Sequence, residues 1–163
     1  MPSLSSPVHV LGSQIAIRAR FYQARAEAPK RAQVPTIIPK HESALLPRFP
    51  AVEILLGTQT PVHDCWVTVT DERGRQHRFL VSCTFHPQVA VNYAMRARFP
   101  DLPSWNGEAV VMAIGSRNRV VSLRGDAQLA LADAALRMFI SRVQADLVGL
   151  EGLTLPFDIP TDI

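Results

Sequence analysis

One histidine and two cysteines are the residues of this sequence whose types and spacing could do chemistry. His63, Cys65 and Cys83 lie in two β-rich runs on either side of a glycine-containing turn. If that turn is a three-residue loop ending at Gly74, which tolerates the left-handed conformation, His63 lies opposite Cys83 and Cys65 lies one diagonal away. Imidazole and thiolate groups gathered in this way can bind zinc, and a thiolate beside a base can act as a nucleophile.

A structural role explains the two thiols more simply. Free cysteine is among the most buried residue types and packs as a small apolar side chain. The acidic residues are scattered over expected loops, and the sequence contains no P-loop, Rossmann glycine pattern, HExxH, GxSxG or double CxxC. We therefore expect no catalytic residue, no bound metal or other cofactor and no disulfide. A thiol- or metal-dependent enzyme is the third-ranked function.

The runs around Gly74 predict an antiparallel hairpin with one apolar face. In the predicted register Val67 faces Phe79, and Trp66 faces Leu80. The odd-numbered positions are then mostly apolar and the even-numbered positions mostly polar, as in a half-buried strand pair. A slip of one residue would mix the two sets. We expect the odd face to lie against the core and the even face to lie in solvent.

Two helices and a second hairpin follow from proline, loop and periodicity signals. Proline suits the first helical position, so a helix is predicted from His86-Pro87 to about Arg98. Residues 109–114 and 120–123 predict the second hairpin, and the first of these runs is apolar on both faces. A final helix from about residue 127 carries an apolar stripe at helical spacing: Leu129, Ala132, Leu136, Phe139, Ile140 and Val143.

These elements predict a single domain of the α+β class. Residues 51–56 are expected to add one extra strand, and Asp133 and Arg137 are expected to pair on the solvent side of the last helix. The prediction is an antiparallel sheet of two hairpins plus this strand, in ββα–ββα order, with the helices on one face. Residues 51–147 would form the domain, and residues 148–163 an extended apolar and acidic tail.

The first 50 residues predict a proline-rich arm with at most one strand. They hold seven of the thirteen prolines, and proline removes a ladder donor and disfavours helix before it. Two apolar islands lie between these prolines, Ile37-Ile38 and Leu45-Leu46. An extended segment of this kind can add to the sheet of a partner. We therefore treat these four residues as candidate partner-binding positions, although the arm could equally close over its own core.

Six arginines gather at the two predicted hairpin tips: Arg73, Arg75, Arg78, Arg117, Arg119 and Arg124. Fifteen of the seventeen cationic residues are arginine, which genomic composition alone can explain. Arginine is also well suited to phosphate, and a patch of this kind would bind nucleic acid in a salt-dependent way. Nucleic-acid binding is therefore the second-ranked function.

Chain length, hydropathy and the N-terminal charge pattern favour an intracellular interaction module. A chain of 163 residues can bury an adequate core without disulfides. No apolar run approaches the length of a membrane span, and no positively charged segment precedes the first apolar stretch. We expect a cytoplasmic or nuclear protein without a membrane partner, acting as a non-enzymatic protein-interaction or assembly module, with a protein partner or self-association into an oligomer.

Overall fold

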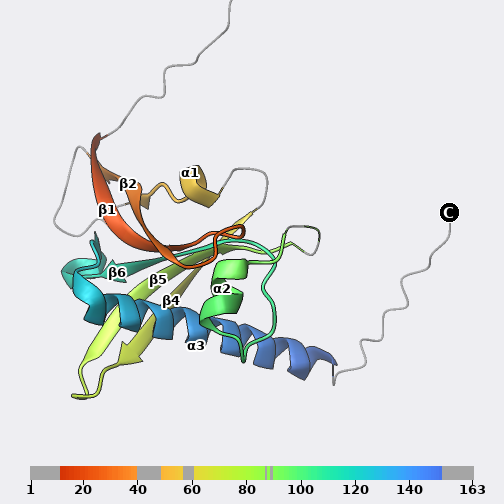
Figure 1. Cartoon of the computed structure of the whole chain (residues 1–163). Coiled ribbons are helices and arrows are strands. Elements are labelled where there is room, and N and C mark those ends of the chain that lie inside the picture. The colour runs from red at the N-terminus through yellow and green to blue at the C-terminus, as the bar shows by residue number, and fades with distance from the viewer. Residues whose placement is uncertain (1–11, 40–48, 57–60, 87, 89, 152–163) are drawn as a thin grey trace, which may run out of the picture.

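The computed structural model describes residues 12–39, 49–56, 61–86, 88 and 90–151 (Figure 1). Its strands are β1 (Gly12–Tyr22), β2 (Lys30–Pro39), β3 (Phe49–Pro50), β4 (Val62–Thr70), β5 (Gln76–Thr84), β6 (Ala109–Ile114) and β7 (Val120–Val121). Its helices are α1 (Glu53–Leu56), α2 (Tyr93–Arg98), the 3-10 turn η1 (Ser116–Asn118) and α3 (Gly125–Glu151).

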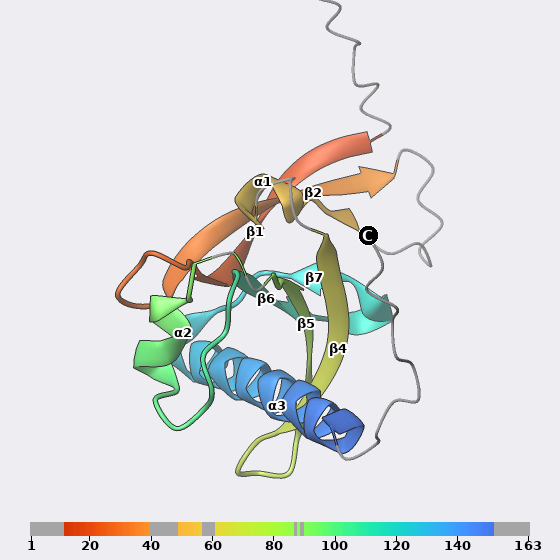
Figure 2. The same ribbon diagram turned by 90° about the vertical axis from the view of Figure 1, so that its right-hand side faces the viewer.

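The strands form one antiparallel sheet, which confirms the α+β class. Their order across the sheet is β3-β2-β1-β6-β5-β4, and the short strand β7 pairs with β6. Strand β1 pairs with β2 along ten residues, but it pairs with β6 only through Arg20, Phe21 and Tyr22. The β1–β2 hairpin therefore leaves the plane of the other strands and bends over one of their faces (Figures 1 and 2).

The first predicted hairpin has the expected register. Val67 faces Phe79 and Trp66 faces Leu80 along β4 and β5. Gly74 has a φ of 77°, the left-handed conformation that the loop requires. The Asp71 carboxylate fixes the turn, because one of its oxygens accepts hydrogen bonds of 2.9 Å from the backbone N–H groups of both Arg73 and Arg75.

The two faces of this hairpin are covered differently from the prediction. On the odd face the central residues of the pair are buried, as expected. On the even face Thr68 and Arg78 are exposed, but Leu80, Ser82 and Thr84 are buried. The expectation of a solvated even face is therefore wrong for the second half of β5. The sequence of this hairpin does not show that another part of the chain folds over it.

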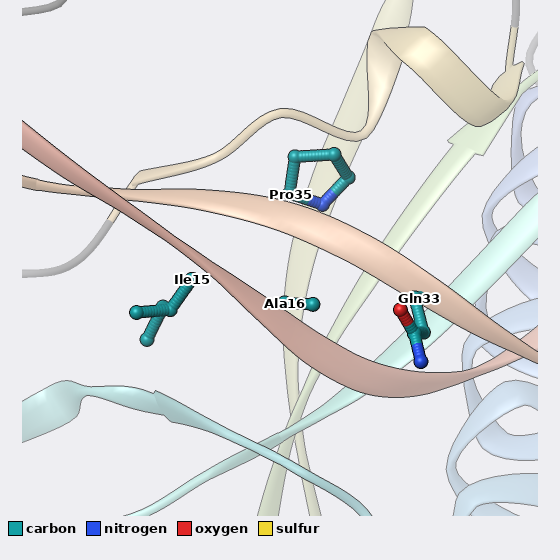
Figure 3. A pocket seen from close by; sticks show the side chains of 4 residues that line it. All are labelled: Ile15, Ala16, Gln33 and Pro35. Carbon is teal, nitrogen blue, oxygen red and sulfur yellow. The ribbon is translucent and has the colours of Figure 1, made fainter.

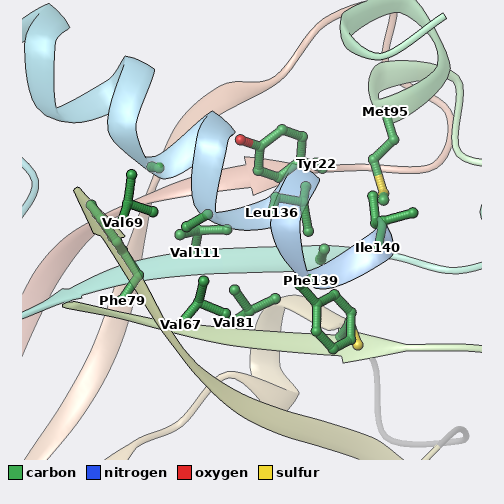
Figure 4. Close-up of a cluster of buried hydrophobic side chains, with 14 of the residues drawn as sticks. Tyr22, Val67, Val69, Phe79, Val81, Met95, Val111, Leu136, Phe139 and Ile140 are labelled. Carbon is green, nitrogen blue, oxygen red and sulfur yellow. The ribbon is translucent and has the colours of Figure 1, made fainter. Parts of the chain in front are cut away.

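Two apolar clusters lie on opposite faces of the sheet. The first lies between the sheet and the helices α2 and α3, and Figure 4 shows Leu136 and Phe139 of α3 on the side of Val67, Val81 and Val111, with Ile140 beside Met95. The second lies under the β1–β2 hairpin and α1, and it includes Ile17, Val34, Leu80, Val110 and Met112. Strand β6 contributes to both clusters, and all six of its residues are buried, as its sequence predicts.

The proline-rich arm and the extra strand are not confirmed. Residues 12–39 form the β1–β2 hairpin, which is an integral part of the sheet. Residues 53–56 form the helical turn α1, whose Leu55 and Leu56 N–H groups donate to the carbonyl of Val52. Because this hairpin precedes the other elements, the ββα–ββα order does not describe the whole sheet. Helices α2 and α3 share one face, but α1 packs on the other.

The predicted helix at residues 86–98 begins later than expected, at Tyr93. Asn92 precedes it as the N-cap, and its side-chain oxygen accepts a hydrogen bond of 2.8 Å from the backbone N–H of Met95. The amide nitrogen of Asn92 donates to the carbonyl oxygens of Tyr22 and Gly107. Asn92 is fully buried, so these bonds fix the position of α2 against β1. Proline statistics alone cannot show such a long-range constraint.

The last helix confirms the predicted stripe and corrects the predicted ion pair. In α3 the stripe residues Ala132, Leu136 and Ile140 are buried, and the helix continues through Glu151, beyond the expected start of the tail. Asp133, however, is buried at 4% exposure and does not pair with Arg137. Arg137 pairs instead with Asp101, at the surface.

Asp133 binds three side chains from two other elements. Arg20 donates to both of its oxygens at 3.0 and 3.1 Å, Arg98 donates at 2.8 Å, and the Tyr22 hydroxyl donates to one oxygen. Burial, with the Asp133 charge as the second cause, raises the pKa of Tyr22 well above its usual value. The network joins α3 to β1 and α2. A buried carboxylate is tolerated only with such partners.

Replacing Asp133 by alanine should destabilise the fold by about 3–5 kcal/mol, because the largely buried Arg20 would lose the carboxylate that compensates its charge and the buried Tyr22 hydroxyl would lose its acceptor. The free energy of unfolding from urea titration measures this. Asp101→Ala is the matched control, since it removes an exposed carboxylate that pairs with α3, and it should change stability little. Equal, small effects of the two substitutions would show that the Asp133 network contributes nothing.

Candidate functional site

Strand β4 ends the strand order opposite β3 and is an open edge of the described sheet (Figure 2). Among the described residues no strand pairs with its outer side. The opposite end of the path is β3, which has only two residues and ends in Pro50. Short strands and proline protect an edge from pairing with another chain. The nine residues of β4 include no proline, glycine or lysine.

Hydrogen-bond geometry identifies the groups that β4 presents outward. The N–H of Asp71 donates to the carbonyl of Arg75, so the backbone groups of Asp71 point towards β5. These directions alternate along an antiparallel strand. Odd-numbered residues of β4 therefore bond to β5, and the even-numbered residues point both backbone groups away from it. The outward residues are Val62, Asp64, Trp66, Thr68 and Thr70.

The hydrogen bonds between β5 and β6 agree with this assignment. The N–H of Thr84 donates to the carbonyl of Glu108, at the start of β6. Even-numbered residues of β5 thus point towards β6, and its odd-numbered residues point towards β4, as the register requires.

Trp66 lies at the middle of this open edge with its side chain 52% exposed. Its cross-strand neighbour Leu80 is only 7% exposed, because it belongs to the second apolar cluster, which on β4 is contacted by Val62 and not by Trp66. Sites that bind an extended segment combine backbone groups free to form hydrogen bonds with an exposed aromatic side chain. The backbone groups bind the main chain of the partner, and the aromatic residue contacts its side chains.

The loop of the second hairpin lies against strand β5. Arg78 of β5 donates to the Asn118 side chain at 2.7 Å and to the Gly115 carbonyl at 3.3 Å. A groove of about 450 Å³ lies between strand β5 and the β6–β7 loop. Its lining includes His77, Arg78 and Ser116.

The six arginines of the tips differ in how they are used. Arg78 joins strand β5 to the second loop, and Arg75 pairs with Asp71 at 2.9 Å. Arg73, Arg117 and Arg124 are exposed, and their side chains make no hydrogen bond or ion pair with the described part of the chain. Arg119 is half-buried in the second loop. Three cations therefore remain available to an anionic ligand.

The two cysteines lie where the register predicts, but their surroundings do not favour thiol chemistry. His63 faces Cys83 in the register, as predicted. Cys83 is buried in the first apolar cluster while His63 is exposed, and burial, together with the nearby Asp64, raises the pKa of Cys83 to about 12. Both cysteines are free, and the described residues contain no group of three or more ligands that could hold a metal ion. A thiolate nucleophile at Cys83 is therefore not supported.

The candidate partner-binding residues do not lie on a free segment. The backbone of Ile37 is paired with Gln14 on one side and with Phe49 on the other, and Ile38 faces Ser13. Strand addition at this island would have to displace the protein's own strands. Leu45 and Leu46 lie outside the described residues.

A second cavity lies on the β1–β2 hairpin. It has a volume of about 380 Å³, and the described residues that line it are Ile15, Ala16, Gln33 and Pro35, as Figure 3 shows. These three apolar side chains and one amide supply neither an acid–base pair nor a nucleophile.

The sequence allows open strand edges but does not identify β4 as one of them. It predicts that Trp66, Thr68 and Thr70 share one face of the hairpin, but a single hairpin does not determine the order of strands across the sheet. The signal that could have suggested it is the combination of a large aromatic residue with threonines on the predicted polar face.

Alkylation should distinguish the two thiols. At pH 8 Cys65 should react with iodoacetamide, whereas Cys83 should react only on unfolding, because a pKa of about 12 leaves almost no thiolate. Mass spectrometry of the digested protein reports each site, and a Cys65→Ser variant should take up no label when folded. Rapid labelling of Cys83 in the folded protein would contradict this account of its burial.

Comparisons with known proteins add no functional assignment. No protein-family model, no curated protein and no solved structure matches this chain. In the part of the chain that the structure describes, none of the helices has the length and apolar character needed to cross a membrane. The function is inferred from the open edge of β4 and from the arginines at the hairpin tips.

Proposed function

We propose that this protein is a non-enzymatic interaction and assembly module that binds an extended partner segment along β4. The observation that carries the proposal is the row of outward backbone groups on five alternate residues of a long, unprotected edge. An antiparallel partner strand could bond to each of them. The free thiols are compatible with an intracellular location.

The energetics of such an edge are adequate for reversible binding. Each hydrogen bond gained by exchange with water contributes only about 0.5–1.5 kcal/mol, so the backbone alone gives modest affinity. Trp66 adds an apolar contact at the centre of the edge, where aromatic residues contribute most to binding. The rigid sheet behind β4 keeps the ordering cost low, because β4 is already paired with β5 along its full length.

Proline at an outward position should abolish partner binding and spare the fold. The N–H of Thr68 points away from β5, so a Thr68→Pro variant loses an edge donor without breaking the β4–β5 ladder. Thr68→Ala is the matched control, because it removes the side chain and keeps the donor. The probe is a phage-displayed library of seven-residue peptides rich in β-branched residues, selected on the native protein.

Selected peptides should bind the native protein and the Thr68→Ala variant equally, and should lose at least about tenfold in affinity for the Thr68→Pro variant. Circular dichroism should show the same fold for all three proteins. Selection of no peptide, or of peptides that bind the Thr68→Pro variant as tightly as the native protein, would contradict binding along β4.

Nucleic-acid binding is the second candidate function. Its support is the contact of Arg78 with the second loop and the three exposed arginines Arg73, Arg117 and Arg124. Aromatic side chains that could stack on bases are scarce around the groove between β5 and the β6–β7 loop, where Phe79 is the only aromatic residue among the described lining residues and is itself buried in the core. This argues for the edge as the first candidate.

A salt titration separates the two candidates. If the tips bind phosphates, affinity for single-stranded RNA or DNA should fall by about 0.7 log units per log of salt for each phosphate that is neutralised. Replacing Arg73, Arg117 and Arg124 by glutamine should then abolish that binding and leave peptide binding unchanged. Undetectable nucleic-acid binding even at low salt would eliminate this candidate.

A further inference from the structure

We infer that the partner strand is β4 of a second copy of this chain, so that two sheets join edge to edge about a two-fold axis at Trp66. This inference rests on the proposed function and names its partner. The argument uses the register of the outward groups, the residues they would bring together and the exposure of Trp66. The result would be a symmetric dimer with a continuous sheet across both copies.

The position of Trp66 makes the edge self-complementary. Trp66 is the middle residue of Val62–Thr70, and it is also the middle one of the outward residues. When two β4 strands run antiparallel with Trp66 facing its copy, Asp64 faces Thr68 and Val62 faces Thr70 in both directions. Every outward N–H and C=O then finds a partner, since facing residues of this kind exchange two hydrogen bonds.

In other registers fewer of the outward backbone groups of β4 form hydrogen bonds with the second copy. A shift of two residues in either direction keeps outward residues opposite one another, but leaves one outward residue at an end of each strand without a partner. A shift of one residue places outward groups against residues whose backbone is already bonded to β5. The edge therefore selects the register centred on Trp66.

The side chains that this register brings together are compatible. The charged Asp64 faces a neutral threonine, so no like charges meet across the interface. Asp64 also accepts a hydrogen bond of 2.5 Å from Ser82, which keeps its carboxylate over its own sheet. The two Trp66 side chains emerge on the same face and can pack on each other, which removes apolar surface from water on both copies.

Self-recognition explains this combination better than an unrelated partner does. A second copy brings its own Trp66 to the exposed Trp66 at the centre of the edge, and it places no like charge opposite Asp64. A two-fold interface uses the same patch on both subunits, so each contact occurs twice, and this requires a patch that is complementary to itself. The outward positions of β4 meet that requirement.

Cysteine cross-linking tests the register. In a Cys65→Ser background, Asp64→Cys and Thr68→Cys proteins are purified separately, mixed and oxidised with copper phenanthroline. Facing residues of a hydrogen-bonded pair have Cα atoms about 5.5 Å apart, which lies within the range for a disulfide. The mixture should give a disulfide-linked dimer. Each protein alone should not, because residue 64 and its own copy would lie more than about 13 Å apart along the strand.

Sedimentation equilibrium tests the contribution of Trp66. The full-length native protein should show a concentration-dependent dimer, and a Trp66→Lys variant should dimerise at least about tenfold more weakly, with its fold checked by circular dichroism. Tyr93→Lys is the matched control, because Tyr93 is a similarly exposed aromatic residue on α2, away from the edge. It should leave the dimer unchanged.

The outcomes separate this inference from the proposed function. A protein that stays monomeric, yet loses its selected peptides on Thr68→Pro substitution, would overturn the dimer and leave the interaction module intact. A dimer that forms equally with Trp66→Lys, or cross-linking of either single-cysteine protein alone, would overturn the proposed register. A monomer that also fails to select peptides would overturn both.

Discussion

Strand β6 has to be covered on both faces, and the rest of the fold depends on this constraint. Its six residues are all apolar and all buried. The long helix α3 covers the face that carries Val111, and among the described residues no comparable helix covers the other. The β1–β2 hairpin covers that face instead: it pairs briefly with β6 and then bends across Val110 and Met112, where α1 also packs. On β4 this second cluster is contacted by Val62, and Trp66 remains half-exposed.

The buried Asp133 network fixes how the covering elements sit relative to each other. Asp133 is on α3, Arg20 and Tyr22 are on β1, and Arg98 ends α2. Apolar contacts alone would permit these elements to slide, because dispersion and the hydrophobic effect have little directionality. A carboxylate held by two arginines and a phenol permits one arrangement. Together with Asn92, it makes the frame behind β4 rigid.

Local features of the fold followed from the sequence, and long-range ones did not. The register of the β4–β5 hairpin, the conformation of Gly74 and the apolar stripe of α3 depend on neighbours within a few residues or on strict periodicity, and these predictions are confirmed. The arm, the extra strand and the start of α2 depend on contacts between distant segments. Asp133 illustrates the limit, since its helical spacing to Arg137 suggested a surface ion pair while the fold buries it.

The same limit applies to the candidate site. Sequence reasoning assigned six arginines to the two hairpin tips, and the structure shows Arg78 within β5, where its side chain donates to Asn118. Sequence reasoning also treated the apolar islands of the arm as partner-binding segments, whereas Ile37 and Ile38 are paired within the sheet. A binding edge is defined by the strand that is missing beside it. No property of β4 alone could identify it before the order of the strands was known.

Amide hydrogen exchange along β4 tests the central claim most directly. In dilute protein the amides of Trp66 and Thr68 should exchange rapidly, while those of Val67 and Val69 should be protected by the ladder to β5. Raising the protein concentration should slow exchange at Trp66 and Thr68 and leave the other two unchanged. Equal protection of both sets in dilute protein would contradict the account, because it would show that the outer side of β4 is already bonded within the monomer.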